Sequence, residues 1–203
     1  QGTQKLGQVH FKWRGDVGKL QRLFPELKAR FYEEAAFLTA NMEKRGGGVS
    51  DVVLRDQTAL EPDYYQLFVS FETCDSMGAN FINSVLESFA QSLTGFFGLH
   101  PAFGEEERQV EVIMSILSNY TPECLVRTWV ECPVEDLEGV CNDLDAATFA
   151  RRFCQAVRIA HIDPHRATTH NKGIFNGVDA VVVATGNDFR AVEACGHTYA
   201  ARD

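Results

Sequence analysis

The sequence predicts a two-domain α+β protein whose first domain has the ferredoxin-like βαββαβ order of elements. Alternating polar and apolar residues indicate strands, and apolar residues at helical spacing indicate two long helices between them. In this split βαβ motif, two helices cover one face of an antiparallel sheet. The pattern changes near residues 118 and 119, so we expect domains at 1–118 and 119–203.

Six elements are expected in the first domain. The first strand alternates strictly (QVHFKW), and the first helix is either one long helix or a pair broken near Pro25. The glycines of residues 45–48 end that helix, and a turn at residues 61–63 separates the next two strands. In chain order the expected elements are 8–13, 19–43, 50–55, 65–71, 76–93 and 110–117.

The second domain is expected to be part of a larger α/β domain. A strand (CLVRTWVEC), a helix, a loop and a second strand precede a last helix that begins at Asp188. The first four of these elements span 124–132, 144–161, 163–176 and 180–185. The chain begins with Gln1 and its last residues have the pattern of a helix interior, so we expect it to be a piece of a longer protein.

The composition is that of an ordinary globular protein and argues against two function classes. Of the 203 residues, 45% are hydrophobic and 23% are charged, and the net charge is −9. Binding nucleic acid requires a basic surface, so no nucleic-acid partner is expected. No apolar stretch approaches the roughly 20 residues that a membrane span needs, so no membrane association is expected.

The six cysteines predict a reducing compartment. None of them forms a C-x-x-C pair, and several lie in apolar helical or strand-like segments. Free cysteine in such segments behaves as a small hydrophobic residue. We therefore expect reduced thiols and a cytoplasmic location rather than a disulfide framework.

The stretch HNKGIFNGVDAVVVATGND, residues 170–188, contains the first candidate site. Lys172 lies beside Gly173 in the expected loop, and Asp188 follows the expected strand at a helix start. A lysine among glycines can approach a ligand and neutralise an oxyanion. Backbone N–H groups at a helix start stabilise a carboxylate. Spacing alone favours a simpler interpretation, a solvated loop lysine and a helix-capping Asn-Asp pair.

Two other segments carry weaker signals. Arg166 could bind a carboxylate through two hydrogen bonds, although a lone loop arginine is more often a surface residue. The segment DSMGAN, residues 75–80, opens the second helix, where Gly78 would let a ligand approach the helix N-terminus. An ordinary capped helix start has the same pattern.

The sequence argues against a metal centre and against two common catalytic folds. His161, His165 and His170 have metal-like spacing, but Pro164 interrupts the helix that would align the first pair. No carboxylate or cysteine completes the set, so no metal site is expected. The chain has neither a G-x-G-x-x-G after a strand nor a G-x-S-x-G, the motifs of the Rossmann fold and the nucleophile elbow.

Two long segments resemble the class II (bacterial) 3-hydroxy-3-methylglutaryl-coenzyme A (HMG-CoA) reductases. CDSMGANFINSVLE is similar to the Asp-Ala-Met-Gly-Ala-Asn segment of that family. IDPHRATTHNKGIFNGVDAVVVATGNDFRAVEACGHTYAARD resembles its catalytic-lysine region almost word for word. RGGG and ILSN occur in the family's order as well. The resemblance covers most of the chain and is tightest at 75–87 and 163–203.

The resemblance implies two successive hydride transfers from a nicotinamide cofactor. HMG-CoA would be reduced through a thiohemiacetal and an aldehyde to mevalonate and coenzyme A, or the reverse. By resemblance, Lys172 meets the former carbonyl oxygen, Asp188 holds the lysine, and Asn119 ties this network to the cofactor side. Arg166 and Asn176 match positions that hold the hydroxymethylglutaryl group.

The resemblance also implies a small cofactor domain that is not a Rossmann fold, matched here by residues 1–118. Its dinucleotide-contacting positions correspond to Asp75, Met77, Gly78 and Asn80. NADH-preferring members carry an aspartate seven residues before the triple glycine, where this chain has Thr39. A neutral residue would not repel a 2′-phosphate, so NADPH is expected to be preferred over NADH.

Two parts of the family's active site have no match in these 203 residues. They are the segment with the catalytic glutamate, ahead of the cofactor domain, and the mobile C-terminal segment with the catalytic histidine. We therefore expect an internal fragment that is inactive alone. The family's active site lies at a dimer interface, which implies a homodimer or a higher oligomer of dimers. The alternative is a catalytically dead dinucleotide-binding or assembly module, which would have no need to keep Lys172, Asp188 and Asn119.

Overall fold

The computed structural model describes residues 3–202 and divides the chain into two compact units. The first unit ends at Leu125 and the second begins at Val126. Within the described residues, no helix has both the length and the apolar character needed to cross a membrane.

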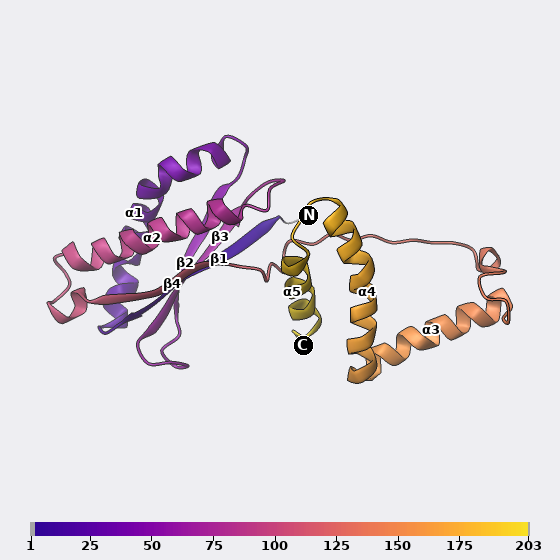
Figure 1. Cartoon of the computed structure of the whole chain (residues 1–203). Coiled ribbons are helices and arrows are strands. Elements are labelled where there is room, and N and C mark those ends of the chain that lie inside the picture. The colour runs from indigo at the N-terminus through magenta and orange to yellow at the C-terminus, as the bar shows by residue number, and fades with distance from the viewer. Residues whose placement is uncertain (1–2, 203) are drawn as a thin grey trace. The chain divides into compact units, whose positions relative to one another are not determined.

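The first unit is a four-stranded antiparallel sheet with two long helices (Figure 1). The strands lie in the order β2-β3-β1-β4, and each pairs antiparallel with its neighbour. All six elements expected for this part of the chain are present in the expected order. They are β1 (Gln4–Trp13), α1 (Val17–Glu43), β2 (Gly48–Asp56), β3 (Tyr64–Glu72), α2 (Ala79–Leu99) and β4 (Val110–Ser118), with a 3-10 turn η1 (Glu106–Arg108) before β4.

The first helix is continuous, although Pro25 lies inside it. A proline at this position removes one backbone hydrogen bond, so other contacts must hold the helix together. The Asp16 side chain caps the N-terminus by accepting a hydrogen bond from the Gly18 N–H at 2.8 Å. A buried stripe that includes Leu27 and Phe31 continues past the proline, and this packing offsets the lost bond.

The core lies between the sheet and the two helices, which cover the same sheet face (Figure 1). Alternate residues of β1, including Val9 and Phe11, point into this core and are fully buried. The Phe31 ring on α1 stacks on Phe89 of α2 with centroids 4.7 Å apart. The two helices therefore pack against each other as well as against the sheet.

A buried hydroxyl on α2 holds a carboxylate on α1. The Ser92 hydroxyl donates a hydrogen bond to Glu34, which also pairs with Arg30 at 2.5 Å. These bonds, the Ser92 bond first, lower the pKa of Glu34. A depressed carboxyl pKa contributes stability above the pKa of the unfolded chain, and that stability is lost as the pH falls through the folded pKa.

We expect Ser92→Ala to lower the free energy of unfolding by about 1 kcal/mol near pH 7, because one net hydrogen bond is lost and Glu34 is partly exposed. The difference should shrink as the pH falls below about 4 and the carboxyl becomes protonated, at a lower pH in the unmodified protein than in the variant because the Ser92 bond lowers the Glu34 pKa. Urea unfolding followed by Trp13 fluorescence, in a Trp129→Phe background, measures it. Thr94→Ala, on the exposed side of the same helix, is the matched control. An equal loss at pH 7 and pH 3 would contradict the assignment.

The second unit is helical in its described residues and contains no strand there. Its elements are the 3-10 turn η2 (Val134–Leu137), α3 (Ala146–Ile162), α4 (Pro164–Ala184) and α5 (Phe189–Ala200). The expected helices at 144–161 and from Asp188 correspond to α3 and α5. The predictions of strands at 124–132 and 180–185 and of a loop at 163–176 are wrong.

The segment at 124–132 alternates like a strand but has no neighbouring strand to pair with. Val126 and Val130 are 89% and 95% exposed, and Trp129 is 76% exposed. A strand is stabilised by its ladder and its cross-strand side chains. Without either, the backbone of this segment forms no regular element.

The segment at 163–185 forms one helix despite two internal glycines and a run of valines. Asp163 caps it by accepting the His165 N–H at 3.0 Å, and Pro164 occupies the first turn, where its missing N–H costs nothing. Half-buried side chains recur at helical spacing, at Ala167, Asn171, Phe175, Val178 and Val182. Contacts with α3 and α5 therefore override the strand preference of the valines.

Candidate functional site

One end of the sheet in the first unit gathers several of the residues predicted to bind the cofactor. At this end Gly48 pairs with Glu72, and Glu72 also faces Gln4. On the other side of β1, Ser118 pairs with Leu6. Next to these paired positions lie three segments of the chain. The glycine turn (residues 45–48) ends at Gly48, the helix-entry loop (residues 75–80) follows Glu72, and Asn119 follows Ser118. The antiparallel topology therefore brings three separate sequence motifs to one end of the sheet.

The helix-entry loop exposes polar side chains beside an uncapped helix end. Asp75 and Asn80 are exposed, and Met77 is 47% exposed. Gly78 has a φ of 74°. The Thr73 side chain packs against it so closely that a Cβ added at Gly78 would lie 2.5 Å from the methyl carbon of Thr73. No side chain caps the N-terminus of α2. Its first backbone N–H groups can therefore donate hydrogen bonds to an anionic ligand.

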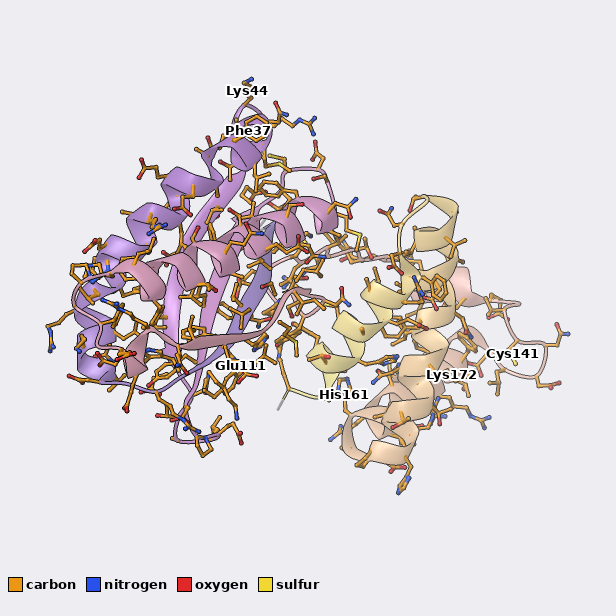
Figure 2. All side chains as sticks on the ribbon, turned by 60° about the vertical axis from the view of Figure 1, so that its left-hand side comes forward. Phe37, Lys44, Glu111, Cys141, His161 and Lys172 are labelled. Carbon is orange, nitrogen blue, oxygen red and sulfur yellow. The ribbon has the colours of Figure 1, made fainter. Side chains whose placement is uncertain are left out.

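Thr39 lies on the buried face of α1. Its side chain is 4% exposed, and its hydroxyl donates to the Ala36 carbonyl at 3.3 Å. It continues the stripe of Phe31 and Ala35 along the helix. The exposed side chains near this end of α1 include Lys44, labelled in Figure 2, and Arg45.

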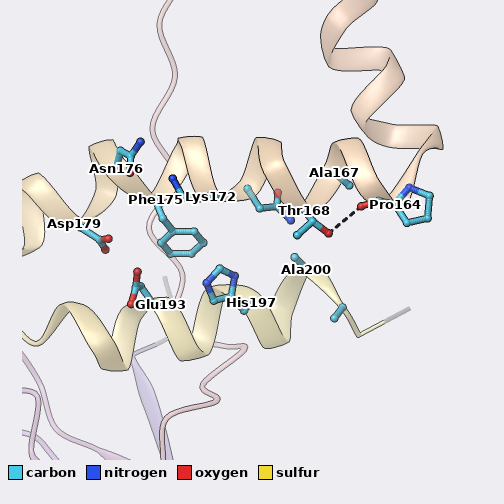
Figure 3. Close-up of a pocket in the computed structure, with 12 residues that line it drawn as sticks. Pro164, Ala167, Thr168, Lys172, Phe175, Asn176, Asp179, Glu193, His197 and Ala200 are labelled. Carbon is cyan, nitrogen blue, oxygen red and sulfur yellow. Dashed lines mark hydrogen bonds between the residues drawn. The ribbon is translucent and has the colours of Figure 1, made fainter.

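In the second unit, a groove between α4 and α5 contains two of the predicted site residues (Figure 3). Lys172 and Asn176 lie one helical turn apart on α4, so their side chains share a face. The Phe175 ring contacts the His197 ring across the groove with centroids 4.7 Å apart. The groove has a volume of about 590 Å³ and is lined by Pro164, Ala167, Thr168, Asn171, Lys172, Phe175, Asn176, Asp179, Glu193, His197, Ala200 and Ala201.

The other predicted residues of this unit lie apart from the groove lining. Asp188 caps α5, and its Oδ1 accepts the Arg190 N–H at 3.1 Å and the Ala191 N–H at 3.4 Å. Arg166 lies on α4 six residues before Lys172. Within residues 3–202, Lys172 forms neither a hydrogen bond nor an ion pair, so the structure does not join it to Asp188. Asn119 belongs to the first unit.

Sequence reasoning missed three groove residues, namely Asp179, Glu193 and His197. Figure 3 places Asp179 and Glu193 on facing sides of the groove. Asp179 Oδ1 is buried and has no hydrogen-bond partner among the described residues. Asp179 lies seven residues after Lys172, which is two helical turns. That spacing would have identified it if the segment had been interpreted as a helix.

The described residues contain no group of three or more His, Cys, Asp or Glu side chains that could hold a metal ion. The three histidines with metal-like spacing lie on two helices, His161 on α3 and both His165 and His170 on α4. All six cysteines are free thiols.

Comparison with known proteins identifies the family. The family described as hydroxymethylglutaryl-coenzyme A reductase matches residues 2–203. A probable 3-hydroxy-3-methylglutaryl-coenzyme A reductase of Borreliella burgdorferi is 29% identical over 197 residues, which are 97% of this chain and 42% of that protein. The 3-hydroxy-3-methylglutaryl-coenzyme A reductase of Archaeoglobus fulgidus is 33% identical over 156 residues, 77% of this chain and 32% of that protein. The chain thus spans less than half the length of either relative.

Solved structures agree with the sequence relatives. The 3-hydroxy-3-methylglutaryl-coenzyme A reductase of Streptococcus pneumoniae matches with a TM-score of 0.75 and 34% identity, covering all of this chain and 51% of that one. A class II enzyme from the same organism, bound to NADPH in open conformations, matches with a TM-score of 0.74 and 34% identity over the same shares. Because the family match extends from residue 2 to residue 203, the chain belongs to the hydroxymethylglutaryl-coenzyme A reductase family.

Proposed function

We propose that the chain is part of a class II HMG-CoA reductase, which converts HMG-CoA to mevalonate and coenzyme A or runs the reverse reaction. The observation that carries this proposal is the family match over residues 2–203. Lys172 and Asn176, together on the wall of one groove, add a chemical reason. The substrates, coenzyme A release and a dimeric or higher assembly follow from the proposed function. We propose a cytoplasmic enzyme without nucleic-acid or membrane partners.

The reaction makes specific demands on this chain. A nicotinamide cofactor, when bound, supplies one hydride in each of two reductions. The first reduction adds a hydride and a proton to the thioester carbonyl, and the C–S bond of the thiohemiacetal then breaks to release coenzyme A as its thiol. The second adds a hydride and a proton to the aldehyde. Negative charge develops on the same oxygen in both reductions, and a fixed cation beside it lowers both barriers.

We propose that Lys172 supplies this cation. Its side chain is exposed at the groove and free of an ion pair among the described residues, so its ammonium can meet an incoming oxygen. Asn176, one turn further along α4, and Arg166 would hold the hydroxymethylglutaryl group through its hydroxyl and carboxylate. Asp188 and Asn119 would complete the network around the lysine when substrate and cofactor are bound.

We propose that residues 1–118, within the first unit, form a ferredoxin-like cofactor domain and that residues 119–203 are part of the larger catalytic domain. Sheet order, antiparallel pairing and two helices on one sheet face support the first assignment. Asp75, Met77, Gly78 and Asn80 would contact the dinucleotide, its phosphates lying near the uncapped N-terminus of α2. The Thr39 hydroxyl is buried and already bonded, so it would not itself bind the cofactor. Thr39 would favour NADPH only because it carries no charge that repels the 2′-phosphate.

Reduction of HMG-CoA by the complete enzyme, followed as the loss of reduced-nicotinamide absorbance, tests the proposed function. Turnover that yields mevalonate and coenzyme A supports it. Saturable dinucleotide binding without any turnover would instead favour a catalytically dead binding or assembly module.

We expect the complete enzyme to prefer NADPH over NADH. The region near the C-terminus of α1 carries exposed Lys44 and Arg45 and no aspartate at position 39. The double substitution Lys44→Ala, Arg45→Ala should lower kcat/KM for NADPH about tenfold and leave that for NADH nearly unchanged, because a hydrogen-bonded ion pair to the 2′-phosphate is lost.

Arg22→Ala is the matched control, since it removes an exposed cation at the opposite end of the same helix. A clear preference for NADH in the unmodified enzyme would contradict the prediction. If that preference survived Thr39→Ala, the discrimination would be set elsewhere.

A further inference from the structure

Residues 72–74, at the end of β3, lie between the glycine turn and the helix-entry loop and touch both. The Cys74 thiol donates to the Arg45 carbonyl oxygen at 3.2 Å. A Cβ added at Gly47 would lie 2.5 Å from the Glu72 carbonyl oxygen. On the other side, the Thr73 side chain fills the space above Gly78, and its hydroxyl donates to the Ser76 carbonyl at 2.7 Å. Three successive residues therefore set how far apart the two loops lie.

The backbone of Cys74 is held in an uncommon conformation. Its φ is 52°, in the left-handed region that non-glycine residues rarely adopt. Its N–H donates to Glu72 Oε1 at 2.7 Å, and Glu72 Oε2 accepts the Thr3 hydroxyl at 2.5 Å. Such conformations persist where the surroundings determine them, and they occur often at ligand-binding loops. In this conformation the thiol reaches across to the glycine turn.

We propose that Cys74 is a positioning residue for the dinucleotide. Its thiol bond to the Arg45 carbonyl holds the glycine turn in register with the helix-entry loop, so that one bound nucleotide can contact both. The proposal rests on the proposed function, because it takes these two loops as the cofactor contacts. It adds a residue with no direct contact to the cofactor, whose effect should appear in cofactor affinity alone.

Steady-state kinetics of the complete enzyme test the proposal. We expect Cys74→Ala to raise KM for NADPH about three- to tenfold, the worth of one hydrogen bond, with kcat and KM for HMG-CoA within about twofold of the unmodified enzyme. Cys74→Ser keeps a donor at the same place and should restore most of the affinity. Cys141→Ala, a half-buried cysteine of the second unit, is the matched control and should change nothing.

Two results would overturn the inference: an unchanged KM for NADPH in Cys74→Ala, whether or not kcat falls, or no rescue by Cys74→Ser. If Cys74→Ala does not fold, Cys74→Gly decides, because glycine adopts a positive φ without strain and still lacks the thiol. It should show the same rise in KM. An unmodified enzyme that does not oxidise NADPH with HMG-CoA would refute the proposed function itself, a result distinct from these.

Discussion

Lys172→Ala in the complete enzyme is expected to lower kcat by roughly 10²–10³-fold without changing the melting temperature. Removing a group that stabilises a developing oxyanion costs on the order of 3–4 kcal/mol of barrier. The lysine side chain is exposed on α4 and forms no ion pair among the described residues, so its removal leaves no unpaired partner. Turnover and melting temperature are measured on the same preparation.

Arg158→Ala is the control for this experiment, because it removes an exposed cation from the neighbouring helix α3. It should leave turnover unchanged. Lys172→Arg keeps the charge but not the compact ammonium group, and it should recover only part of the rate. Near-normal turnover of Lys172→Ala would end the assignment of this lysine to the chemistry.

The 203-residue chain, purified by itself, should show no detectable turnover of HMG-CoA. By the family resemblance, the glutamate and the histidine that move protons during the reaction lie in segments other than these residues. General acid–base groups contribute typically 10²–10⁴-fold each, so the loss of both reduces the rate below ordinary detection. The measurement is a steady-state assay of this chain beside the complete enzyme at equal molar concentration.

A folded but inactive chain is the expected outcome, so circular dichroism should accompany the assay. Native-like helix and sheet signals would show that missing groups, and not misfolding, account for the inactivity. A rate within tenfold of the complete enzyme would mean that these residues carry the whole proton-transfer machinery, and the assignment of outside groups would be abandoned.

The sequence predicts the first unit well because its pattern and its packing agree. The two central strands, β1 and β3, alternate toward the face that the two helices cover, so their apolar positions identify the core directly. The position of Thr39 also follows from the sequence once the stripe of Phe31, Ala35 and Met42 is extended through it. The pattern alone could not show whether Pro25 breaks the helix, because that depends on how much surface α1 buries.

The second unit is harder to predict because local preference and packing disagree. Three successive valines, Val181 to Val183, and two glycines argue for a strand and a loop, yet contacts with α3 and α5 hold the segment as a helix. The resemblance predicts which residues are candidates without knowledge of the fold. It does not predict which side chains lie together, because Lys172 and Asp179 share a face only on a helix.

Position 188 caps α5, and in the proposed function it also supplies a negative charge, so two separate requirements act on one residue. Serine, threonine or asparagine there could still accept the Arg190 N–H and keep the helix folded, but only aspartate also brings a charge. If Asp188 holds the lysine as proposed, Asp188→Asn would keep the helix cap and remove the charge that the reaction uses. Among related genes, asparagine at this position would then identify copies that have lost the activity while their fold is still intact.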